Sequence, residues 1–269
     1  MKLLIDSHVH VYPNYDLARF FHRAWLNLSS GAVDLLNGSQ TIPVLMLTER
    51  HDCSFFRDLI GGRFELPNGL EIRSCGANSV QIGGAGGMEL VIIAGRQIVS
   101  AERIEVLALL ADLALKDGQP IDELIPEISR LGAFPVLPWS PGKWFSSRGQ
   151  KIEQILLAYK PGQIGFSDSA LRPAGWPLPR LLQMAGLKSF VVIAGSDPLP
   201  LSGEEERAGS YFTAADAPSL TVESGAQQIE DAVRTILMDP QSPGRLISCG
   251  RRLTPLALLT RLFRLKSAA

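Results

Sequence analysis

The sequence predicts an α/β fold in which strands and helices alternate along the chain. Short apolar runs end abruptly in polar clusters, as buried strands do where they reach the edge of a sheet. After residue 120, segments with helical spacing of apolar residues alternate with such runs. The chain has 269 residues, of which 46% are hydrophobic and 20% charged, so it can bury a sizeable core. Repeated strand–helix units imply a parallel sheet, either open or closed into a barrel.

The first elements are a strand, an amphipathic helix and a second strand. Lys2–Ile5 is an apolar run that ends in the polar tip Asp6-Ser7-His8-Val9-His10. Residues 16–29 have helical spacing, and Thr41–Leu47 is a further apolar strand. The apolar face expected for the helix consists of Leu17, Phe20, Phe21, Ala24 and Leu28.

The segment from residue 63 to 109 alternates β-like runs with Gly and Asn turns. Asn68-Gly69 is a hairpin signal, and Gly83–Gly87 is typical of a flexible hairpin turn. Core strands are expected at Met88–Ile93 and Ile104–Leu109. The rest of the chain follows a strand–helix rhythm, and no linker divides it, so residues 1–269 are expected to form one domain. The helices expected there are Ile121–Leu131, Gln150–Tyr159, Leu178–Ala185 and Ala226–Leu237, and the strands are Ala133–Leu137, Gln163–Phe166, Ser189–Ala194 and Ser219–Val222.

Composition excludes several classes of protein. The 26 Lys and Arg residues nearly balance the 27 Asp and Glu residues, which argues against a nucleic-acid binder. No apolar run approaches the ~20 residues of a membrane span, and the N-terminus becomes polar too early for a signal peptide. Three cysteines without Cys-x-x-Cys spacing indicate neither a disulfide framework nor a zinc knuckle. A cytoplasmic location is therefore the default expectation.

Polar residues follow the expected strands, and the most specific of them are His8 and His10. In an extended chain, residues i and i+2 point to the same side, so the two imidazoles can face one metal ion. A carboxylate such as Asp6 could fix a ring tautomer from behind. Five polar clusters follow expected strands. Because functional groups gather at the carboxyl ends of parallel strands, we expect these clusters to lie on one rim of the fold. They are His8/His10, Glu49–Asp52, Ser140–Lys143, Asp168 and Ser196-Asp197.

The tip Asp6-x-His8-x-His10 resembles the opening motif of the PHP (polymerase and histidinol phosphatase) family and, more distantly, that of the amidohydrolases. The resemblance covers roughly residues 3 to 200 and implies a distorted (β/α) TIM-like barrel of the PHP type, with a β-hairpin insertion around residues 63–93. It also implies a metal-dependent hydrolase. The later segments that resemble the family's motifs, in order, are Leu47–Asp52, Ala94–Ile98 with Ile104–Leu107, Val136–Lys143, and Ala194–Asp197.

Several positions depart from the family's pattern of metal ligands. Gln97 occupies the position of the family's bridging glutamate. Glu105 and Ser140 occupy positions where the family has histidines, and Leu199 occupies the position of its last histidine. The resemblance implies that His8, His10 and Asp197 are metal ligands. Asp16 lies near the position of the first-motif aspartate, and Glu105 could provide a further carboxylate ligand. The expected cofactor is therefore a divalent ion, Zn, Mn or Fe, in fewer than the three positions of a full PHP site, or none at all.

The resemblance implies a phosphoesterase more than an amidohydrolase, because no histidine follows residue 51. His51 is expected as a further ligand or proton carrier, or else as part of a salt-bridge corner with Arg50. Lys143 and Arg172 are expected to meet the anion of a small, phosphorylated substrate. Trp139, Trp144 and Trp176 lie in the same loops and suggest a partly apolar pocket or lid. The alternative is a degenerate, non-catalytic PHP-like domain that acts as a binding or regulatory module.

The end of the chain is basic and helical. No acidic residue follows Asp239, whereas five arginines and Lys266 do. Thr254-Pro255 is a good N-cap and first-turn pair, so a helix is expected at about residues 254–266. The favoured interpretation is a last helix that packs on the domain, with its basic residues complementing the helix dipole. Docking to an acidic partner or a membrane surface is the alternative.

Overall fold

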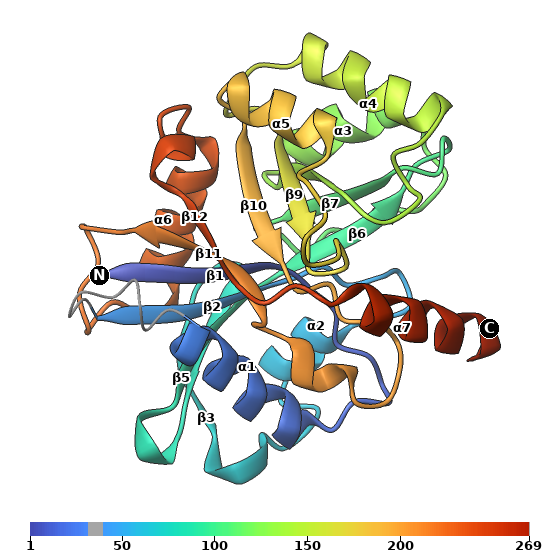
Figure 1. The fold of residues 1–269 in the computed structure, drawn as a ribbon. Helices are drawn as coiled ribbons and strands as arrows, with labels where there is room; N and C mark the ends of the chain where they lie inside the picture. The colour runs from blue at the N-terminus through green and yellow to red at the C-terminus, as the bar shows by residue number, and fades with distance from the viewer. Residues whose placement is uncertain (32–39, 269) are drawn as a thin grey trace.

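The computed structural model describes residues 1–31 and 40–268 and contains two mixed β-sheets with helices packed on them (Figure 1). The seven-stranded sheet has the order β12 (Ile247–Gly250), β11 (Tyr211–Asp216), β1 (Lys2–Val9), β2 (Thr41–Leu47), β5 (Glu89–Ile93), β4 (Ser79–Gly83) and β3 (Glu71–Cys75). The five-stranded sheet has the order β10 (Val191–Gly195), β9 (Gly165–Ser169), β8 (Phe134–Pro138), β7 (Glu105–Leu109) and β6 (Gly95–Val99). The helices are α1 (Leu17–Gly31), α2 (Phe55–Ile60), α3 (Ile121–Arg130), α4 (Ser147–Ala158), α5 (Arg180–Leu187), α6 (Ala226–Met238) and α7 (Pro255–Ala268).

The expected TIM-like barrel is wrong, because the two sheets do not close on each other. In the seven-stranded sheet, β1 pairs in parallel with β2, but its other edge takes the antiparallel strand β11 rather than β10. In the five-stranded sheet, the β6–β7 hairpin reverses the chain, so β7 is antiparallel to both of its neighbours. A (β/α) barrel needs parallel strands joined by crossovers all the way round. Here parallel pairing is confined to two separate runs, β1–β2–β5 in one sheet and β8–β9–β10 in the other.

Most of the expected helices and strands are present within a few residues. β2 has the predicted bounds, and β1 continues past Ile5 through His8 to Val9. The strand expected at Ser219–Val222 is wrong, since those residues form turns after Pro218, and the strand of this region is β11. Two small residues in the middle of β11, Ala214 and Ala215, weaken its apolar pattern.

The segment around residues 63–93 extends the seven-stranded sheet instead of forming a separate hairpin insertion. β3, β4 and β5 form an antiparallel meander, and β5 then pairs in parallel with β2. The Gly-rich turn expected near residues 83–87 is confirmed, since it joins β4 to β5. Asn68-Gly69 is not a hairpin turn, because Pro67–Gly69 forms a short 3₁₀ turn before β3.

The two sheets pack face to face across an apolar core (Figure 1). Helix α6 packs into this core through Ile229, Val233 and Leu237, while other helices cover the outer faces. Helix α1 packs on the seven-stranded sheet through Phe20, Phe21, Ala24 and Leu28, as its periodicity predicts, while Leu17 is only partly buried. Helices α3, α4 and α5 cover the five-stranded sheet. The core between the sheets combines Leu3, Ile5, Val44, Met46, Val91 and Ile93 with Leu107, Leu109, Phe134, Val136, Val191 and Ile193.

Backbone hydrogen bonds join the two sheets where β1, β2 and β10 end. The amide of Glu49 donates to the carbonyl of Gly95 at 3.0 Å, and the amide of Gln97 donates back to Glu49 at 2.9 Å. The amide of Asp197 donates to the carbonyl of His8 at 2.9 Å. The strand ends that carry three of the expected clusters, His8/His10, Glu49–Asp52 and Ser196-Asp197, therefore meet at one place. Among residues 1–31 and 40–268, no helix has both the length and the apolar character that crossing a bilayer requires.

Candidate metal centre

His8, His10 and Asp197 come together where β1 and β10 end. The Nε2 atoms of the two histidines are 3.1 Å apart, and Asp197 Oδ1 lies 3.6 Å from His8 Nε2 and 3.8 Å from His10 Nε2. All three residues are buried, and the three ligand atoms lie within 4.8 Å of one another. The extended backbone of β1 causes both imidazoles to face the same point, as the i, i+2 spacing predicts.

These three atoms have the spacing of ligands around one ion. A tetrahedral zinc site with bonds of about 2.1 Å has ligand atoms about 3.4 Å apart. The observed separations of 3.1, 3.6 and 3.8 Å lie on both sides of that value. Three protein ligands leave a fourth position open, which is the pattern of catalytic rather than structural zinc sites. The residues present therefore fit a single divalent ion.

Asp197 reaches the histidines because of an unusual backbone and a close approach of two strands. Its φ of 50° lies in the left-handed region. The preceding Gly195 packs so tightly on β1 that a Cβ atom there would lie 2.4 Å from His8 Cβ. The second carboxylate oxygen of Asp197 accepts a hydrogen bond from Ser169 Oγ at 3.1 Å. The Asp197 side chain is thereby oriented from β9 as well as β10.

Asp6 supports the site through the backbone and not through a histidine ring, contrary to the expected role. Its carboxylate accepts hydrogen bonds from the amides of His8 (3.2 Å), Ser196 (2.9 Å) and Gly209 (2.7 Å). It therefore ties the ends of β1 and β10 to the segment before β11. Burial raises the pKa of Asp6 to about 6, although these hydrogen bonds act in the opposite direction.

The electrostatics of the centre suit a cation. Burial lowers the pKa of His10 well below its usual value, and the nearby His8 and Arg50 lower it further, so His10 is neutral and can act as a ligand. Burial raises the pKa of Asp197 and outweighs the opposite influence of His8, Lys143 and the hydrogen bond from Ser169, so further positive charge would stabilise the carboxylate. The other ring nitrogen of His8, Nδ1, is buried without a hydrogen-bond partner among the described residues.

Two other expected ligands, Asp16 and Glu105, do not belong to this group. Asp16 is exposed and accepts a hydrogen bond from the amide of Arg19 at 3.1 Å, so it caps helix α1. Glu105 accepts a hydrogen bond from Lys143 Nζ at 2.6 Å. Both members of that pair influence the pKa of Asp197, so they lie beside the centre without entering it.

The surroundings of Arg172 and His51 differ from those expected of a substrate-binding cation and a metal ligand. Arg172 is buried and forms a bidentate ion pair with Asp168, with contacts of 2.8 and 2.6 Å. Tyr211 donates a further hydrogen bond to Asp168 at 2.8 Å. This arginine is therefore committed to an internal pair and is not free for a substrate anion. The side chain of His51 is 66% exposed, and its Nδ1 lies 3.7 Å from a carboxylate oxygen of Asp117.

One neighbour of the centre, Tyr12, was missing from the sequence-based expectation, and another, Arg50, was expected only within the Glu49–Asp52 cluster and as a salt-bridge partner. Tyr12 stacks on the ring of His10, with centroids 5.4 Å apart and an interplanar angle of 29°. The same i, i+2 alternation that places His8 and His10 on one side of the chain also places Tyr12 there, so the sequence pattern could have predicted this contact. Arg50, which pairs with Asp52 at 3.0 Å, is close enough to His10 and Tyr12 to change their pKa values.

One groove adjoins the centre through Gln97. The Oε1 atom of Gln97 lies 3.2 Å from His8 Nε2, and Gln97 also lines a groove of about 550 Å³. The exposed cations Arg57 and Lys116 and the imidazole of His51 lie along this groove. Apolar residues complete its lining, among them Ile98, Leu113 and Leu115.

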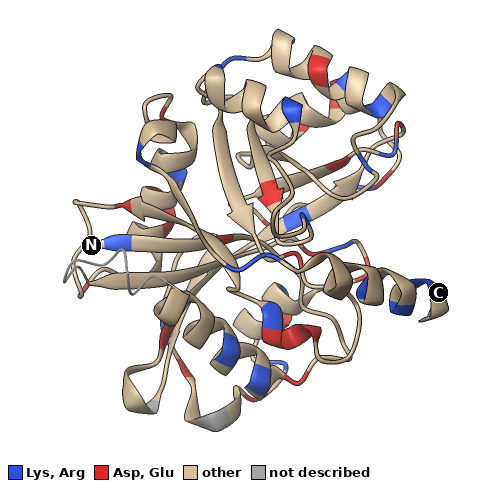
Figure 2. Cartoon of the chain, viewed as in Figure 1, with Lys and Arg blue, Asp and Glu red and all other residues tan. Residues whose placement is uncertain are grey.

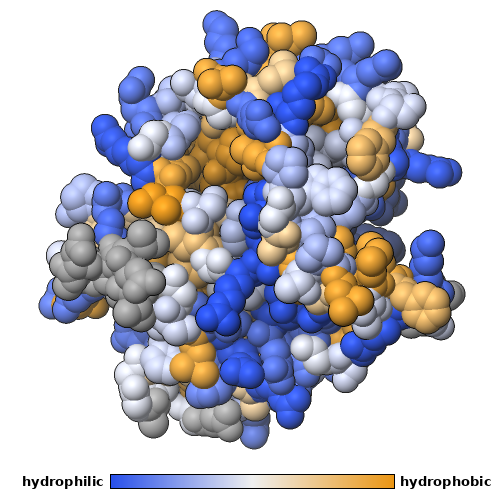
Figure 3. All heavy atoms as spheres, in the orientation of Figure 1, coloured by the Kyte–Doolittle hydropathy of each residue, from blue (hydrophilic) through white to orange (hydrophobic). Residues whose placement is uncertain are grey.

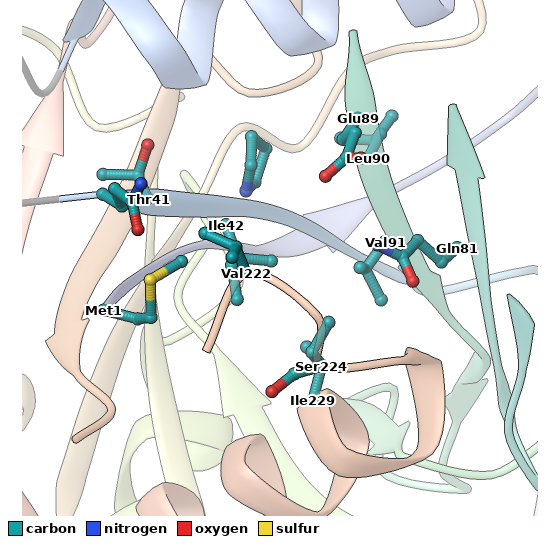
Figure 4. Close-up of a pocket in the computed structure, with 12 residues that line it drawn as sticks. Met1, Thr41, Ile42, Gln81, Glu89, Leu90, Val91, Val222, Ser224 and Ile229 are labelled. Atoms are coloured by element: carbon teal, nitrogen blue, oxygen red, sulfur yellow. The ribbon is translucent and has the colours of Figure 1, made fainter. Parts of the chain in front are cut away.

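Two of the other cavities lie away from the centre. Trp139, Trp144 and Trp176 line one of about 460 Å³, which confirms the partly apolar pocket expected from their loops. The other, of about 290 Å³, lies where β1 and β2 begin and is shown in Figure 4 with Met1 and Thr41 at its edge. Of the described residues that line this second cavity, only Glu89 has an ionisable side chain. Histidines and carboxylates therefore converge at the other end of these strands.

Comparison with known proteins shows a shared fold. No protein-family model matches the chain, and no curated protein matches its sequence. The crystal structure of PsfC from Pseudomonas syringae PB-5123 superposes with a TM-score of 0.58 and 15% identity, covering 100% of this chain and 99% of PsfC. The two proteins therefore share a fold over their whole length.

Two endonuclease structures resemble the chain less closely. One is Endonuclease Q in complex with a 27-mer duplex substrate that has an abasic lesion at the active site, with a TM-score of 0.48 and 12% identity. The other is the lesion-specific endonuclease PfuEndoQ from Pyrococcus furiosus, with a TM-score of 0.48 and 11% identity. Each match covers 88% of this chain and 56% of the endonuclease.

Proposed function

We propose that this chain is a metal-dependent phosphoesterase whose ion is held by His8, His10 and Asp197. The observation that carries the proposal is the convergence of two imidazole nitrogens and one carboxylate oxygen in a buried pocket, at the spacing of a single ion's ligands. The order of sequence motifs that resembles the PHP family supports the same class of enzyme. When bound, a divalent ion would supply positive charge at a substrate oxygen and lower the pKa of a water molecule.

The residues of the chain have separate tasks in this proposal. His10 is neutral because of burial, so it can bind a cation without first losing a proton. Ser169 orients the carboxylate of Asp197, while Asp6 holds the two strand ends in register. These contacts fix the ligand atoms before any ion or substrate arrives, which favours both affinity and catalysis.

Lys143 is the cation best placed to meet a substrate phosphate. It lies close enough to Asp197 to lower the pKa of that carboxyl group, and its side chain is 41% exposed. Its ion pair with Glu105 keeps Nζ near the centre. Arg172 is less suited to this role, because its guanidinium is buried, pairs with Asp168 and also donates to the carbonyl of Trp176.

The groove beside Gln97 is suited to the organic part of a small phosphoester. Apolar side chains such as Leu113 and Leu115 can pack on a carbon skeleton, while Lys116 and His51 can meet its polar groups. His51 would then contact substrate rather than the ion, since its exposed ring lies outside the buried group of ligands.

The alternative function, a non-catalytic binding module, is favoured by one observation. The two imidazoles can form a direct Nε2–Nε2 hydrogen bond, or Gln97 Oε1 can accept a hydrogen bond from the same nitrogen of His8. A site of this kind is stable without an ion. In that case the centre is a relic of an ancestral metal site, and the groove is the functional surface.

Metal analysis of the purified protein separates these alternatives. We expect a bound divalent ion in the wild type, its loss in the double variant His8→Ala/His10→Ala, and metal-stimulated release of phosphate from p-nitrophenyl phosphate. His22→Ala is the matched control, because that histidine is exposed on α1. Equal metal content in the wild type and the double variant would exclude the proposed centre. A rate of phosphate release that is unchanged by chelators would exclude the proposed chemistry.

A further inference from the structure

Helix α7 has an exposed apolar face that the fold does not use. Leu256, Leu259 and Phe263 are 75%, 64% and 73% exposed, and their spacing places them in one stripe along the helix. In Figure 3 this stripe is part of the apolar surface at the position that α7 occupies in Figure 1. Large apolar side chains gathered on a surface indicate an interaction site.

The opposite face of α7 fixes the helix to the protein without help from this stripe. Leu258 is buried with Leu171, Leu199 and Leu201. Arg261 on the same face forms an ion pair with Glu204, and the exposed Arg264, at the border of this face, donates to the carbonyl of Ser202 at 3.3 Å. Folding therefore does not explain why the outer face is apolar.

The charges around the stripe identify the kind of partner. Arg264 and Lys266 are exposed and lie on opposite flanks of the stripe, and Arg251 is exposed just before the helix. Figure 2 shows basic and no acidic residues on α7, in agreement with the sequence after Asp239. A second copy of this helix would bring like charges together, whereas an anionic surface would attract them.

We propose that α7 docks the protein reversibly on an anionic lipid bilayer. Leu256, Leu259 and Phe263 would enter the boundary between headgroups and acyl chains, and Arg264 and Lys266 would extend along it to lipid phosphates. Two leucines, one phenylalanine and a few cations give weak binding that depends on lipid charge and on salt. The docked helix remains tied to the segment that follows Asp197, because Leu199 and Leu201 pack on its inner face.

Vesicle sedimentation of the full chain tests this proposal. We expect the wild type to bind phosphatidylcholine vesicles that contain about 30 mol% phosphatidylserine about tenfold more strongly than pure phosphatidylcholine, and to dissociate as salt is raised. The double variant Leu259→Ser/Phe263→Ser should lose about tenfold in partitioning, and Arg264→Glu/Lys266→Glu should lose the preference for phosphatidylserine. Circular dichroism and thermal melts should show that both variants stay folded, since buried Leu258 and the Arg261–Glu204 ion pair are unchanged and only the exposed hydrogen bond of Arg264 is lost.

Matched substitutions on other surfaces control for nonspecific adsorption. Leu187→Ser removes an apolar side chain that is 87% exposed on α5, and Lys188→Glu reverses an exposed charge beside it. Both should bind vesicles like the wild type. Equal binding by the Leu259→Ser/Phe263→Ser variant, or no binding by the wild type, would overturn the proposal. So would a dimer in gel filtration that this variant dissociates, since the stripe would then be an interface between copies.

Discussion

Replacing Gly195 with alanine tests whether the close approach of β10 and β1 builds the candidate centre. Gly195 is the last residue of β10, and it faces His8 across the junction of the two sheets. A Cβ atom added there would lie 2.4 Å from His8 Cβ, 2.8 Å from His8 N and 3.1 Å from His8 Cα. These atoms belong to or adjoin the backbone of β1, so no side-chain rotation can relieve the overlap.

The size of the effect follows from these distances. Ordinary contact begins at 3.4 Å, so β1 and β10 must separate by at least about 1 Å. Overpacking of this kind costs about 3 kcal/mol of unfolding free energy. Metal sites tolerate errors of only about 0.2 Å in ligand position, so the affinity for Zn or Mn should fall by at least about tenfold.

Denaturant unfolding and metal titration of the same samples measure both effects. Gly186→Ala is the control, because an added Cβ meets nothing within 4 Å at that exposed position in α5. Alanine also has a higher helix propensity, so the control should be as stable as the wild type or up to about 1 kcal/mol more stable. A Gly195→Ala protein with wild-type stability and metal affinity would refute the reasoning.

Three further substitutions test the surroundings of the centre. Arg172→Ala should lower the unfolding free energy by about 3–5 kcal/mol in denaturant melts, because it leaves Asp168 buried and unpaired; a stable variant with only a raised KM would restore Arg172 as a substrate ligand. The pKa of Asp6 is raised from 3.8 to about 6, so its contribution to stability is full below pH 3.8 and is lost as pH rises through 6. The unfolding free energy of the wild type should therefore fall by about 3 kcal/mol relative to Asp6→Asn across this range, and parallel pH profiles would contradict the assignment. Gln97→Glu should tighten Mn binding by about tenfold, or about 1.4 kcal/mol, because it places a carboxylate beside His8 Nε2; a destabilised variant that ignores Mn in thermal melts would mean that no ion binds there.

Local pattern was enough to predict the elements that carry the two histidines. The apolar run at the start of β1 and its polar tip predicted a strand with His8 and His10 on one side, since the alternation of side chains is a property of the extended backbone itself. The same holds for α1, whose buried face follows from the spacing of Phe20, Phe21, Ala24 and Leu28. Asp197 was found because the apolar strand before it ends in a polar turn.

Strand direction and side-chain partners were decided by tertiary structure alone. Nothing in the local sequence shows that β11 pairs with β1, or that the β6–β7 hairpin turns β7 antiparallel, and these two pairings keep the sheets from closing into a barrel. The Arg172–Asp168 pair and the exposed place of His51 depend in the same way on which chain segments meet. The sequence by itself determined most of the strands and helices and the histidine pair, because these follow from the period of side chains along one segment; it missed β11, whose apolar pattern is weak. The open arrangement of the sheets and the free or occupied state of each charged residue come from contacts between distant segments, whose free energy exists only once the chain has folded.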